Sequence, residues 1–340
     1  MADVGAGIAP AFATAYGSDE PVRSDTDGVA ATMKTLIFTH PDFLEHDTGP
    51  GHPERPERIK IVWDVLSRPD FAGIDKREAP EADVDQLARV HDRRYVEDVL
   101  ASVPTDGLVR LDPDTVLSPR SRSAILRASG AVCAAVDAVA TGEADRAFCA
   151  VRPCGHHAEP DRAMGFCVFN NIAVGALHAR AAHGIKRIAV VDFDVHHGNG
   201  TQTTFERDPD LFFASTHQWP FYPGTGSRQE RGRFANIVNV PLDAHAGSER
   251  FRDGFTNAIL PALESFAPEL IMISAGFDAH EDDPLAQIDL VEDDFAWATR
   301  ELVAVAARCC GGRIVSVLEG GYSATGLAQG LAAHMRELVE

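Results

Sequence analysis

Uninterrupted apolar runs of strand length alternate with longer helical patterns from residue 35 to the end of the chain. Because these runs lack the polar alternation of a half-exposed strand, they indicate strands that are buried on both faces. Strands of this kind that alternate with helices predict a parallel sheet covered by helices on both sides. The clearest runs occupy residues 35–40, 146–151, 187–191, 270–274 and 313–318.

Five segments between these runs have helical patterns. The first begins as a loop rich in Gly and Pro at residue 49 and becomes a helix near Pro56, with its apolar residues on one face. The second, residues 121–142, is rich in Ala and ends near a Gly, which predicts a buried helix. The third, residues 170–184, is capped by one of its two initial Asn residues and closed by Gly184. Two amphipathic helices are expected at residues 248–266 and 292–312.

Residues 1–33 differ from the rest of the chain. They are rich in Ala, Gly, Ser and Asp and show no sustained period, which predicts a flexible extension or a loosely docked arm. Neither an internal repeat nor a linker interrupts the remainder. We therefore expect a single domain over residues 34–340.

Charge and cysteine content narrow the class of protein. The formal net charge of −20 argues against a nucleic-acid surface, because phosphate binding needs clustered Lys and Arg. This negative charge either favours cationic substrates or only keeps the protein soluble. No apolar run is expected to be long enough to span a bilayer, and the N-terminus lacks the basic segment of a secretory signal. Six Cys residues without a CxxC pair predict free thiols in a reducing compartment, so we expect a cytoplasmic protein.

Four of the apolar runs lead directly into clusters of His, Asp or Tyr. These clusters are RPCGHHA, DFDVHHGNG, AGFDAH and EGGY. Ligands bind beyond the carboxyl ends of the strands in an open parallel α/β sheet, so the four clusters are expected to build one site. Two carboxylates and one imidazole for a metal, a further His pair and a Tyr hydroxyl together predict a metal-assisted hydrolase.

The segment DFDVHHGNG supplies the first candidate metal ligands. Asp192, Asp194 and His196 alternate, so their side chains point the same way in an extended segment. Asp and His are ordinary zinc ligands, and a third ligand would leave one coordination position for water. Asp278 is the natural third ligand, although an Asp in its position can also cap a helix. The alternative for the whole motif is a polar turn after a buried strand.

His156 and His157 are candidates for acid–base chemistry, because adjacent rings can point to different sides and take different roles. Each needs a partner on its far nitrogen, and Asp192 and Asn199 are available. Two surface imidazoles are the alternative, which the position after a strand disfavours. Tyr322 follows two Gly residues, which predict a mobile hinge that can move its phenol towards a substrate. The alternative is a Tyr ring that only packs over a loop.

The other His residues are not expected to act in this site. His178 and His183 fall on faces of a helix that do not adjoin, and His197 should point away from the ligand before it. No ligand spacing is shared by His40, His46, His52, His91, His217, His245, His280 and His334. Cys154 abuts the His pair and is either redox-sensitive or simply packed.

Taken together, the motifs identify a family. RPCGHHA, MGFCVFNN, VVDFDVHHGNGTQ, FYPGTG, SAGFDAHEDDPL and LEGGY resemble the zinc-dependent histone deacetylase superfamily, and GHPERPERI is similar to its first loop. This superfamily includes bacterial histone-deacetylase-like amidohydrolases and acetylpolyamine amidohydrolases, and the motifs lie closest to the class II branch. The resemblance spans residues 34–340, which would form the deacetylase catalytic domain. It implies an arginase-like α/β fold of three αβα layers with a mostly parallel eight-stranded sheet.

The resemblance also implies the ions of the site. It assigns one catalytic Zn²⁺ to Asp194, His196 and Asp278. It places a structural K⁺ near Asp192, Asp194, His196 and Ser215. Arg58 is similar to an arginine that lies behind the metal and borders an inner exit channel.

The roles of the other polar residues follow from the same resemblance. It makes His157, partnered by Asn199, the general base that takes a proton from water. His156, held by Asp192, becomes the electrostatic or acid partner. Tyr322 would polarise the scissile carbonyl and stabilise the oxyanion.

A substrate channel is implied as well. Phe166 and Tyr222 would line a narrow channel for the aliphatic stem of acyl-lysine, with the Gly165 carbonyl nearby. Asp112 matches a carboxylate at the rim that holds the substrate backbone, although Asp114 competes because the alignment is loose there.

Four positions qualify the resemblance. Cys154 stands where Pro is usual before Gly-His-His, and Tyr222 replaces the more common channel Phe. Leu285 occupies a position where a polyamine-preferring relative carries Glu. Tyr322, where some relatives of low activity carry His, implies full catalytic competence.

The expected function is removal of acetyl or short acyl groups from acyl-lysine in proteins or peptides. The alternative is an acetylpolyamine or other small-amide deacetylase, and Leu285 favours the first because an apolar rim does not select a second ammonium group. A non-catalytic acyl-lysine reader would not need the His pair, and a two-manganese ureohydrolase would need further carboxylates. Neither a nucleic acid nor a membrane is expected as a partner, and the sequence does not decide between a monomer and a homo-oligomer.

Overall fold

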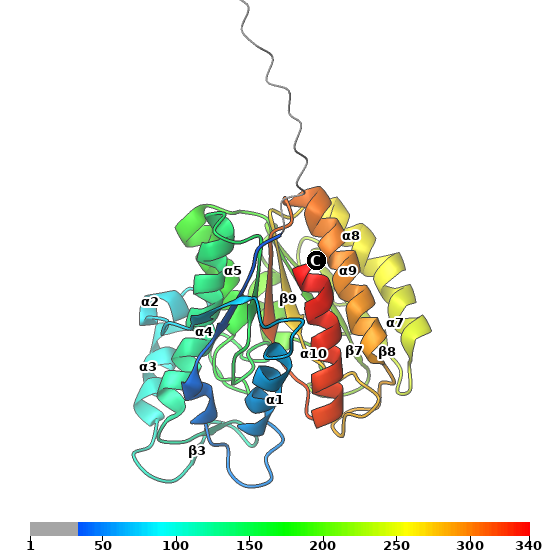
Figure 1. Ribbon diagram of the computed structural model, residues 1–340. Helices are drawn as coiled ribbons and strands as arrows, with labels where there is room; N and C mark the ends of the chain where they lie inside the picture. Colours follow the sequence, from blue (N-terminus) through cyan, green and yellow to red (C-terminus); the bar gives the residue numbers. More distant parts are fainter. Residues whose placement is uncertain (1–32) are drawn as a thin grey trace, which may run out of the picture. The chain divides into compact units, whose positions relative to one another are not determined.

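The structure is a computed structural model that describes residues 33–340. The extension predicted at residues 1–33 lies outside the described residues, apart from Met33. Strands and helices alternate along the described chain as the apolar and amphipathic segments predict (Figure 1).

Eight strands form one sheet, and every pairing between neighbouring strands is parallel. The predicted eight-stranded α/β fold is therefore confirmed. In spatial order the strands are β2 (Asp75–Glu78), β1 (Thr35–Thr39), β5 (Arg146–Cys149), β10 (Ile314–Leu318), β9 (Leu270–Ala275), β6 (Ile188–Asp192), β7 (Leu211–Gln218) and β8 (Ile237–Leu242). A separate antiparallel pair consists of β3 (Val109–Arg110) and β4 (Val116–Leu117).

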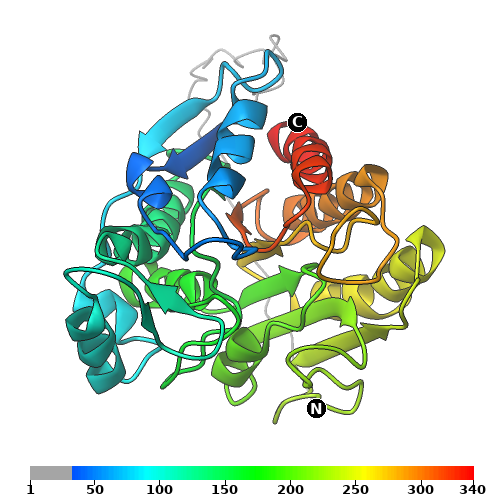
Figure 2. The ribbon, with the colours of Figure 1, turned by 90° about the horizontal axis from the view of Figure 1, so that it is seen from below.

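Helices cover both faces of this sheet (Figures 1 and 2). On one face α4 packs against α5, and on the other α10 packs against both α1 and α9. The α-helices of the described chain are α1 (Glu57–Leu66), α2 (Val84–Leu87), α3 (Arg93–Ser102), α4 (Ser121–Ala140), α5 (Asn171–His183), α6 (Asn199–Phe205), α7 (Ser248–Gly254), α8 (Leu260–Phe266), α9 (Glu292–Cys309) and α10 (Ala324–Val339).

Helix α4 corrects one expectation from the sequence. By length and hydropathy it could cross a membrane, whereas the sequence pattern suggested no run of sufficient length. Within the fold, 72% of its apolar window is buried, and its Ala-rich surface packs against α5 and three strands. A core helix of this kind meets the same criteria of length and hydropathy as a membrane span.

Helix ends agree with the predicted signals, with one interruption. The Asn170 side chain accepts a hydrogen bond from the Ala173 amide at 3.0 Å and caps α5, and Gly184 closes that helix with a φ of 67°. The single helix expected at residues 248–266 is divided into α7 and α8 by a π-helical turn (Phe255–Ile259). The turn ends two residues before Pro261, whose missing N–H removes one helical hydrogen bond.

The four strands that precede the polar clusters are neighbours in the middle of the sheet. Their spatial order is β5, β10, β9 and β6. Because they are parallel, their carboxyl ends lie at one edge, as the site prediction requires. The fold thus brings together residues that are up to 166 positions apart, from His156 to Tyr322.

Candidate active site

Asp194, His196 and Asp278 form a compact group of metal-ligating side chains. The Nδ1 atom of His196 lies 3.2 Å from Oδ1 of Asp194 and 3.1 Å from Oδ2 of Asp278, and the three ligand atoms lie within 4.8 Å of one another. Tetrahedral ligands bound to zinc at about 2.0–2.1 Å lie roughly 3.3 Å apart, so these donor atoms fit a zinc ion. Burial and the charge of Asp194 raise the pKa of Asp278 to about 7, because both destabilise its ionised carboxylate. A bound cation would offset this destabilisation.

The backbone around this group leaves space for the carboxylates and fixes their orientation. A Cβ atom on Gly276 or Gly320 would lie 2.1 Å from a carboxylate oxygen of the group. Gly320 also donates its amide to Oδ2 of Asp194 at 2.8 Å. Glycine at these two positions is therefore required for the close approach of the chain to the metal ligands.

The two adjacent histidines are held by different partners. Nδ1 of His156 lies 2.9 Å from Oδ2 of Asp192, and Nδ1 of His157 lies 2.8 Å from Oδ1 of Asn199. The amide nitrogen of Asn199 donates to Glu159 at 2.6 Å, so its oxygen faces His157 as an acceptor. Nδ1 of His157 therefore carries the hydrogen, and Nε2 of the same ring is the basic nitrogen.

Electrostatics divide the charge of the pair unequally. Burial lowers the pKa of His157 well below its usual value, and the neighbouring His156 lowers it further. Burial also opposes the charging of His156, but the carboxylates of Asp194 and Asp192 outweigh it and raise the pKa of His156 well above its usual value. The pair therefore consists of a charged His156 and a neutral His157, which suits one electrostatic and one basic role.

The loop that carries the His pair is anchored by Glu319, a residue to which the sequence assigned no role. Its Oε2 atom accepts the amides of Gly155 at 2.7 Å and His156 at 3.2 Å. Glu319 is fully buried at the end of β10, the strand next to β5. In the EGGY motif the sequence pointed only to the Tyr. The role of Glu319 was missed because its contacts are with backbone amides that follow a neighbouring strand, and such contacts leave no local sequence signal.

Tyr322 is tied down more firmly than a Gly-Gly hinge predicts. Oδ2 of Asp283 accepts the amides of Tyr322 at 2.7 Å and Ser323 at 3.0 Å. Nε of Arg58 donates to the Gly321 carbonyl at 2.7 Å, and the guanidinium lies 4.8 Å from the Tyr322 ring centre. Burial raises the pKa of Tyr322 well above 10, so its hydroxyl stays protonated and can donate.

A cavity of about 190 Å³ opens beside these groups. Its walls consist of Asp114, His157, Gly165, Phe166, His196, Phe221, Tyr222, Leu285 and Tyr322. The cavity therefore contains the four residues that the sequence analysis placed in the channel or at its rim, namely Gly165, Phe166, Tyr222 and Leu285. The same cavity is lined by the candidate base His157, the metal ligand His196 and the Tyr322 phenol. Phe221 was missed, and it stacks on the His196 ring with centroids 5.7 Å apart. Its position next to Tyr222 in FYPGTG was the available signal.

Of the two candidates for the rim carboxylate, Asp114 and not Asp112 lines the cavity. Oδ1 of Asp114 accepts the Gly165 amide at 3.1 Å. The Asp112 carboxylate instead accepts the amides of Asp114 at 2.9 Å and Thr115 at 2.8 Å, which stabilises a turn. The role of Asp112 in holding substrate stays a prediction, but the structure places Asp114 at the cavity, because the backbone path of the loop decides which of the two Asp residues reaches it.

Two of the residues named for potassium, Asp192 and Ser215, lie on adjacent strands, and Asp194 and His196 follow the end of β6. Ser215 of β7 is directly opposite Asp192 of β6, and both are fully buried. Oδ1 of Asp192 accepts the Asp194 amide at 3.0 Å, while the Ser215 hydroxyl lies 2.9 Å from Nδ1 of His217. This set of residues is therefore contiguous with the candidate zinc ligands.

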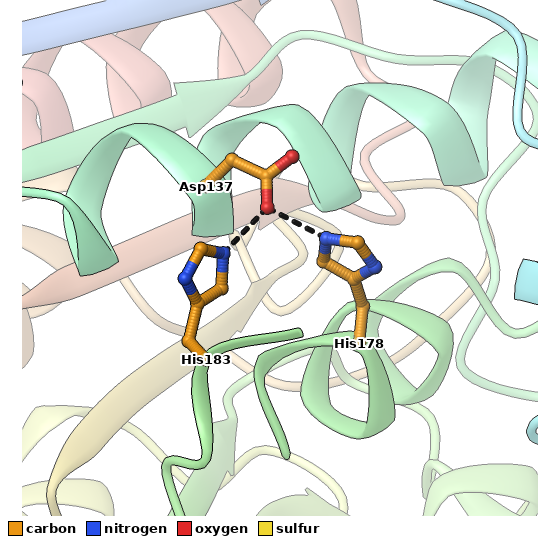
Figure 3. A group of neighbouring side chains, drawn as sticks. All are labelled: Asp137, His178 and His183. Carbon is orange, nitrogen blue, oxygen red and sulfur yellow. Dashed lines mark hydrogen bonds and ion pairs between the residues drawn. The ribbon is translucent and has the colours of Figure 1, made fainter. Parts of the chain in front are cut away.

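His178 and His183 meet at one carboxylate, contrary to the helical-wheel expectation. Figure 3 shows both rings of α5 directed at Asp137 of α4, with Nε2 atoms 2.7 and 2.6 Å from the same oxygen. Arg89 donates to Nδ1 of His178 at 2.6 Å, so Nε2 of that ring carries a hydrogen. These N–O distances are shorter than the 3.1 and 3.2 Å between His196 and the two carboxylates of the candidate metal group. They are typical of hydrogen bonds between the two rings and Asp137.

Comparison with known proteins places the fold and site in one family. Residues 52–338 match the histone deacetylase domain. The chain is 43% identical to the histone deacetylase-like amidohydrolase of Pseudomonas aeruginosa, over 86% of this chain and 78% of that protein. It is 38% identical to a probable deacetylase of Archaeoglobus fulgidus, over 86% of this chain and 83% of that protein.

Two further matches support the same relationship. The type-2 histone deacetylase 2 of Dictyostelium discoideum is 37% identical over 96% of this chain, which covers only 22% of that longer protein. The crystal structure of the HDA15 HD domain superposes with a TM-score of 0.86 at 34% identity, covering 91% of this chain and 89% of that domain. The chain belongs to the histone deacetylase family, whose members are deacetylases and amidohydrolases with a general dependence on zinc.

Proposed function

We propose that this enzyme removes acetyl or short acyl groups from the ε-amine of acyl-lysine in proteins or peptides. The observation that carries the proposal is the cavity of about 190 Å³ between Phe166 and Tyr222, which leads to His157, His196 and Tyr322. Aromatic and apolar walls suit an aliphatic stem, while polar groups gather at its inner end.

We propose Asp194, His196 and Asp278 as the zinc ligands and Tyr322 and the His pair as the catalytic groups. Bound zinc would supply Lewis-acid polarisation of the amide carbonyl and of the attacking water. His157 takes the proton from that water through Nε2, which its bond to Asn199 leaves basic. The Tyr322 hydroxyl donates to the carbonyl oxygen as negative charge develops on it. A protonated imidazole of the pair then gives a proton to the departing amine, and charged His156 stabilises the site while the charge moves.

We also propose that K⁺ is held near Asp192, Asp194, His196 and Ser215. The support is the burial of these side chains, the pairing of Asp192 with Ser215 on adjacent strands, and the membership of Asp194 and His196 in the zinc group. Addition of K⁺ in place of Na⁺ should raise the melting temperature of the zinc-loaded protein. An equal melting temperature in both salts would contradict the proposal.

A cytoplasmic location is likewise a proposal. Its support is that all six cysteines lie in the described part of the chain as free thiols. Fractionation of cells that express the full chain tests this location, and recovery outside the cytoplasm would contradict it.

The substrate proposal is tested by a turnover panel on one zinc-loaded preparation. The panel contains an acetyl-lysine peptide, longer acyl-lysine peptides, acetylspermidine and acetylputrescine. We expect the highest kcat/KM for an acyl-lysine peptide, because Leu285 gives the cavity an apolar wall that does not bind a second ammonium group. The matched variant Leu285→Glu should shift the preference towards acetylspermidine. If acetylspermidine is the best substrate of the unaltered enzyme, the alternative of a small-amide deacetylase replaces this proposal.

A further inference from the structure

Two thiols touch each other directly behind the wall of the catalytic cavity. Cys154 lies two residues before His156, and Cys167 follows Phe166 of the channel wall. Their Sγ atoms are 3.4 Å apart, and only 2% and 0% of the two residues are exposed. The pair packs with Ala158 against Phe166 and forms a small apolar cluster separate from the main core.

Both thiols also contact the backbone of the cavity wall. Sγ of Cys167 lies 3.3 Å from the Gly165 carbonyl oxygen, and Sγ of Cys154 lies 3.8 Å from the same atom. Gly165 and Phe166 have φ values of 57° and 67°, so the wall turns sharply through two left-handed residues. Any change at the thiols therefore acts on the segment that shapes the cavity.

The geometry is close to that of a disulfide without being one. A disulfide needs an Sγ–Sγ separation of about 2.05 Å, so the two sulfurs must approach by roughly 1.3–1.4 Å.

We propose that Cys154 and Cys167 form a modification site at which a small two-electron oxidant such as hydrogen peroxide converts the dithiol into a disulfide and lowers the activity of the enzyme. One thiolate attacks a peroxide oxygen, the O–O bond breaks and hydroxide leaves, giving a sulfenic acid. The second thiolate attacks the sulfenic sulfur, the S–S bond forms and the S–O bond breaks with loss of hydroxide. The two thiols lose two electrons and two protons in total, and one peroxide becomes two waters.

Loss of activity follows from the contacts with Gly165. The disulfide has no S–H group, so the Gly165 carbonyl loses both sulfur donors. The approach of the sulfurs also draws the segments on either side of the cavity wall together. A displacement of about 1 Å at a positioned group can cost roughly 100-fold in rate, so we expect a loss of at least about tenfold. A reductant should reverse it.

The chemical part of the test uses mass spectrometry and does not depend on the proposed function. The zinc-loaded full chain is treated with hydrogen peroxide, free thiols are alkylated under denaturing conditions, and the protein is digested with trypsin. Cleavage after Arg146, Arg162 and Arg180 gives fragments 147–162 and 163–180, which a Cys154–Cys167 disulfide joins. Cys149 shares the first fragment, so the matched variant Cys149→Ala must still give the joined fragments and Cys154→Ser must not.

The functional part compares each variant with its own untreated sample. The unaltered enzyme and Cys309→Ser should lose activity with peroxide and regain it with dithiothreitol, whereas Cys154→Ser and Cys167→Ser should keep theirs. This part rests on the proposed deacetylase activity, so an enzyme without measurable turnover would fail here while the mass result still stood.

Three results would overturn the proposal. One is inactivation of Cys154→Ser to the same extent as the unaltered enzyme. Another is loss of activity in step with loss of zinc and without the joined fragments. The third is a second metal ion per chain together with resistance of both thiols to alkylation, which would make the pair a metal site with Glu319, whose carboxylate lies in the same group.

Discussion

The Nδ1 atoms of His156 and His157 are held by partners of opposite character, although the two rings lie only 4.0 Å apart. A carboxylate accepts from His156 and an amide oxygen accepts from His157. The difference gives two adjacent imidazoles different charges in one buried site, and the pH dependence of the reaction should report it.

We expect the acid limb of the kcat profile to lie below pH 6.5. His157 acts only when neutral, and burial and the charge of His156 lower its pKa below that of an ordinary imidazole, so activity is lost only when the pH falls through this lowered value. Replacement of Asn199 by Asp puts a carboxylate on Nδ1, favours the protonated ring and should move the limb to higher pH. An acid limb above pH 6.5 in the unaltered enzyme would contradict the assignment of His157.

Tyr322→Phe should lower kcat by roughly 10²–10³-fold, the usual loss for one donor to a developing oxyanion. The ring stays, so its edge-to-face contact with Phe166, 5.7 Å between centroids, and its position by Arg58 are kept. Steady-state kinetics at equal zinc content measure the change. Undiminished turnover in the Phe variant would show that the hydroxyl has no part in catalysis.

Asp283 is expected to position Tyr322 rather than to touch the substrate. Asp283→Ala leaves the amides of Tyr322, Ser323 and Leu285 without their acceptor, and each unsatisfied amide costs about 1–3 kcal/mol when buried. We expect a lower kcat with zinc retained and KM for a short substrate little changed. Asp283→Asn keeps one carbonyl acceptor and should recover part of the loss.

The exposed neighbour Asp282 provides the control for this experiment. Its side chain is 52% exposed, so Asp282→Ala should leave both kcat and the melting temperature unchanged. A melting temperature that falls in Asp283→Ala without any fall in kcat would mean that the residue acts on stability alone.

Asp114 and Asp112 provide a matched pair for the rim of the cavity. Asp114→Asn removes a charge from the cavity wall and should raise KM for an acetyl-lysine peptide by roughly tenfold, since a hydrogen bond to a charged group contributes about 1.5–3 kcal/mol. Asp112→Asn keeps the carbonyl oxygen that the turn requires and should leave KM unchanged. The reverse order of effects would restore Asp112 as the rim residue.

The sequence alone was sufficient to predict the site residues that directly follow strands. Asp194, His196 and Asp278 come directly after buried apolar runs, and the parallel topology brings the ends of those runs to one edge. Such placement depends on local pattern and one rule of sheet architecture. The same rule places the His pair and Tyr322 at that edge.

Residues whose role depends on distant backbone could not be found in this way. Glu319 and Asp283 act by accepting amides from other loops, and neither contact has a sequence signature. His178 and His183 are five positions apart, about 140° on a regular helix, yet both reach Asp137 because α5 ends at His183. Tertiary partners, not the helical period, decide where these side chains point.

The zinc content of Asp278→Ala tests the central claim most directly. Elemental analysis after removal of loosely bound metal should find about one zinc per chain in the unaltered protein and in Asp282→Ala, because three protein ligands hold it. Asp278→Ala lacks one of the three ligand atoms that lie within 4.8 Å of one another and should retain little zinc while still folded. Full zinc occupancy in folded Asp278→Ala would contradict the assignment of this group as the catalytic metal site.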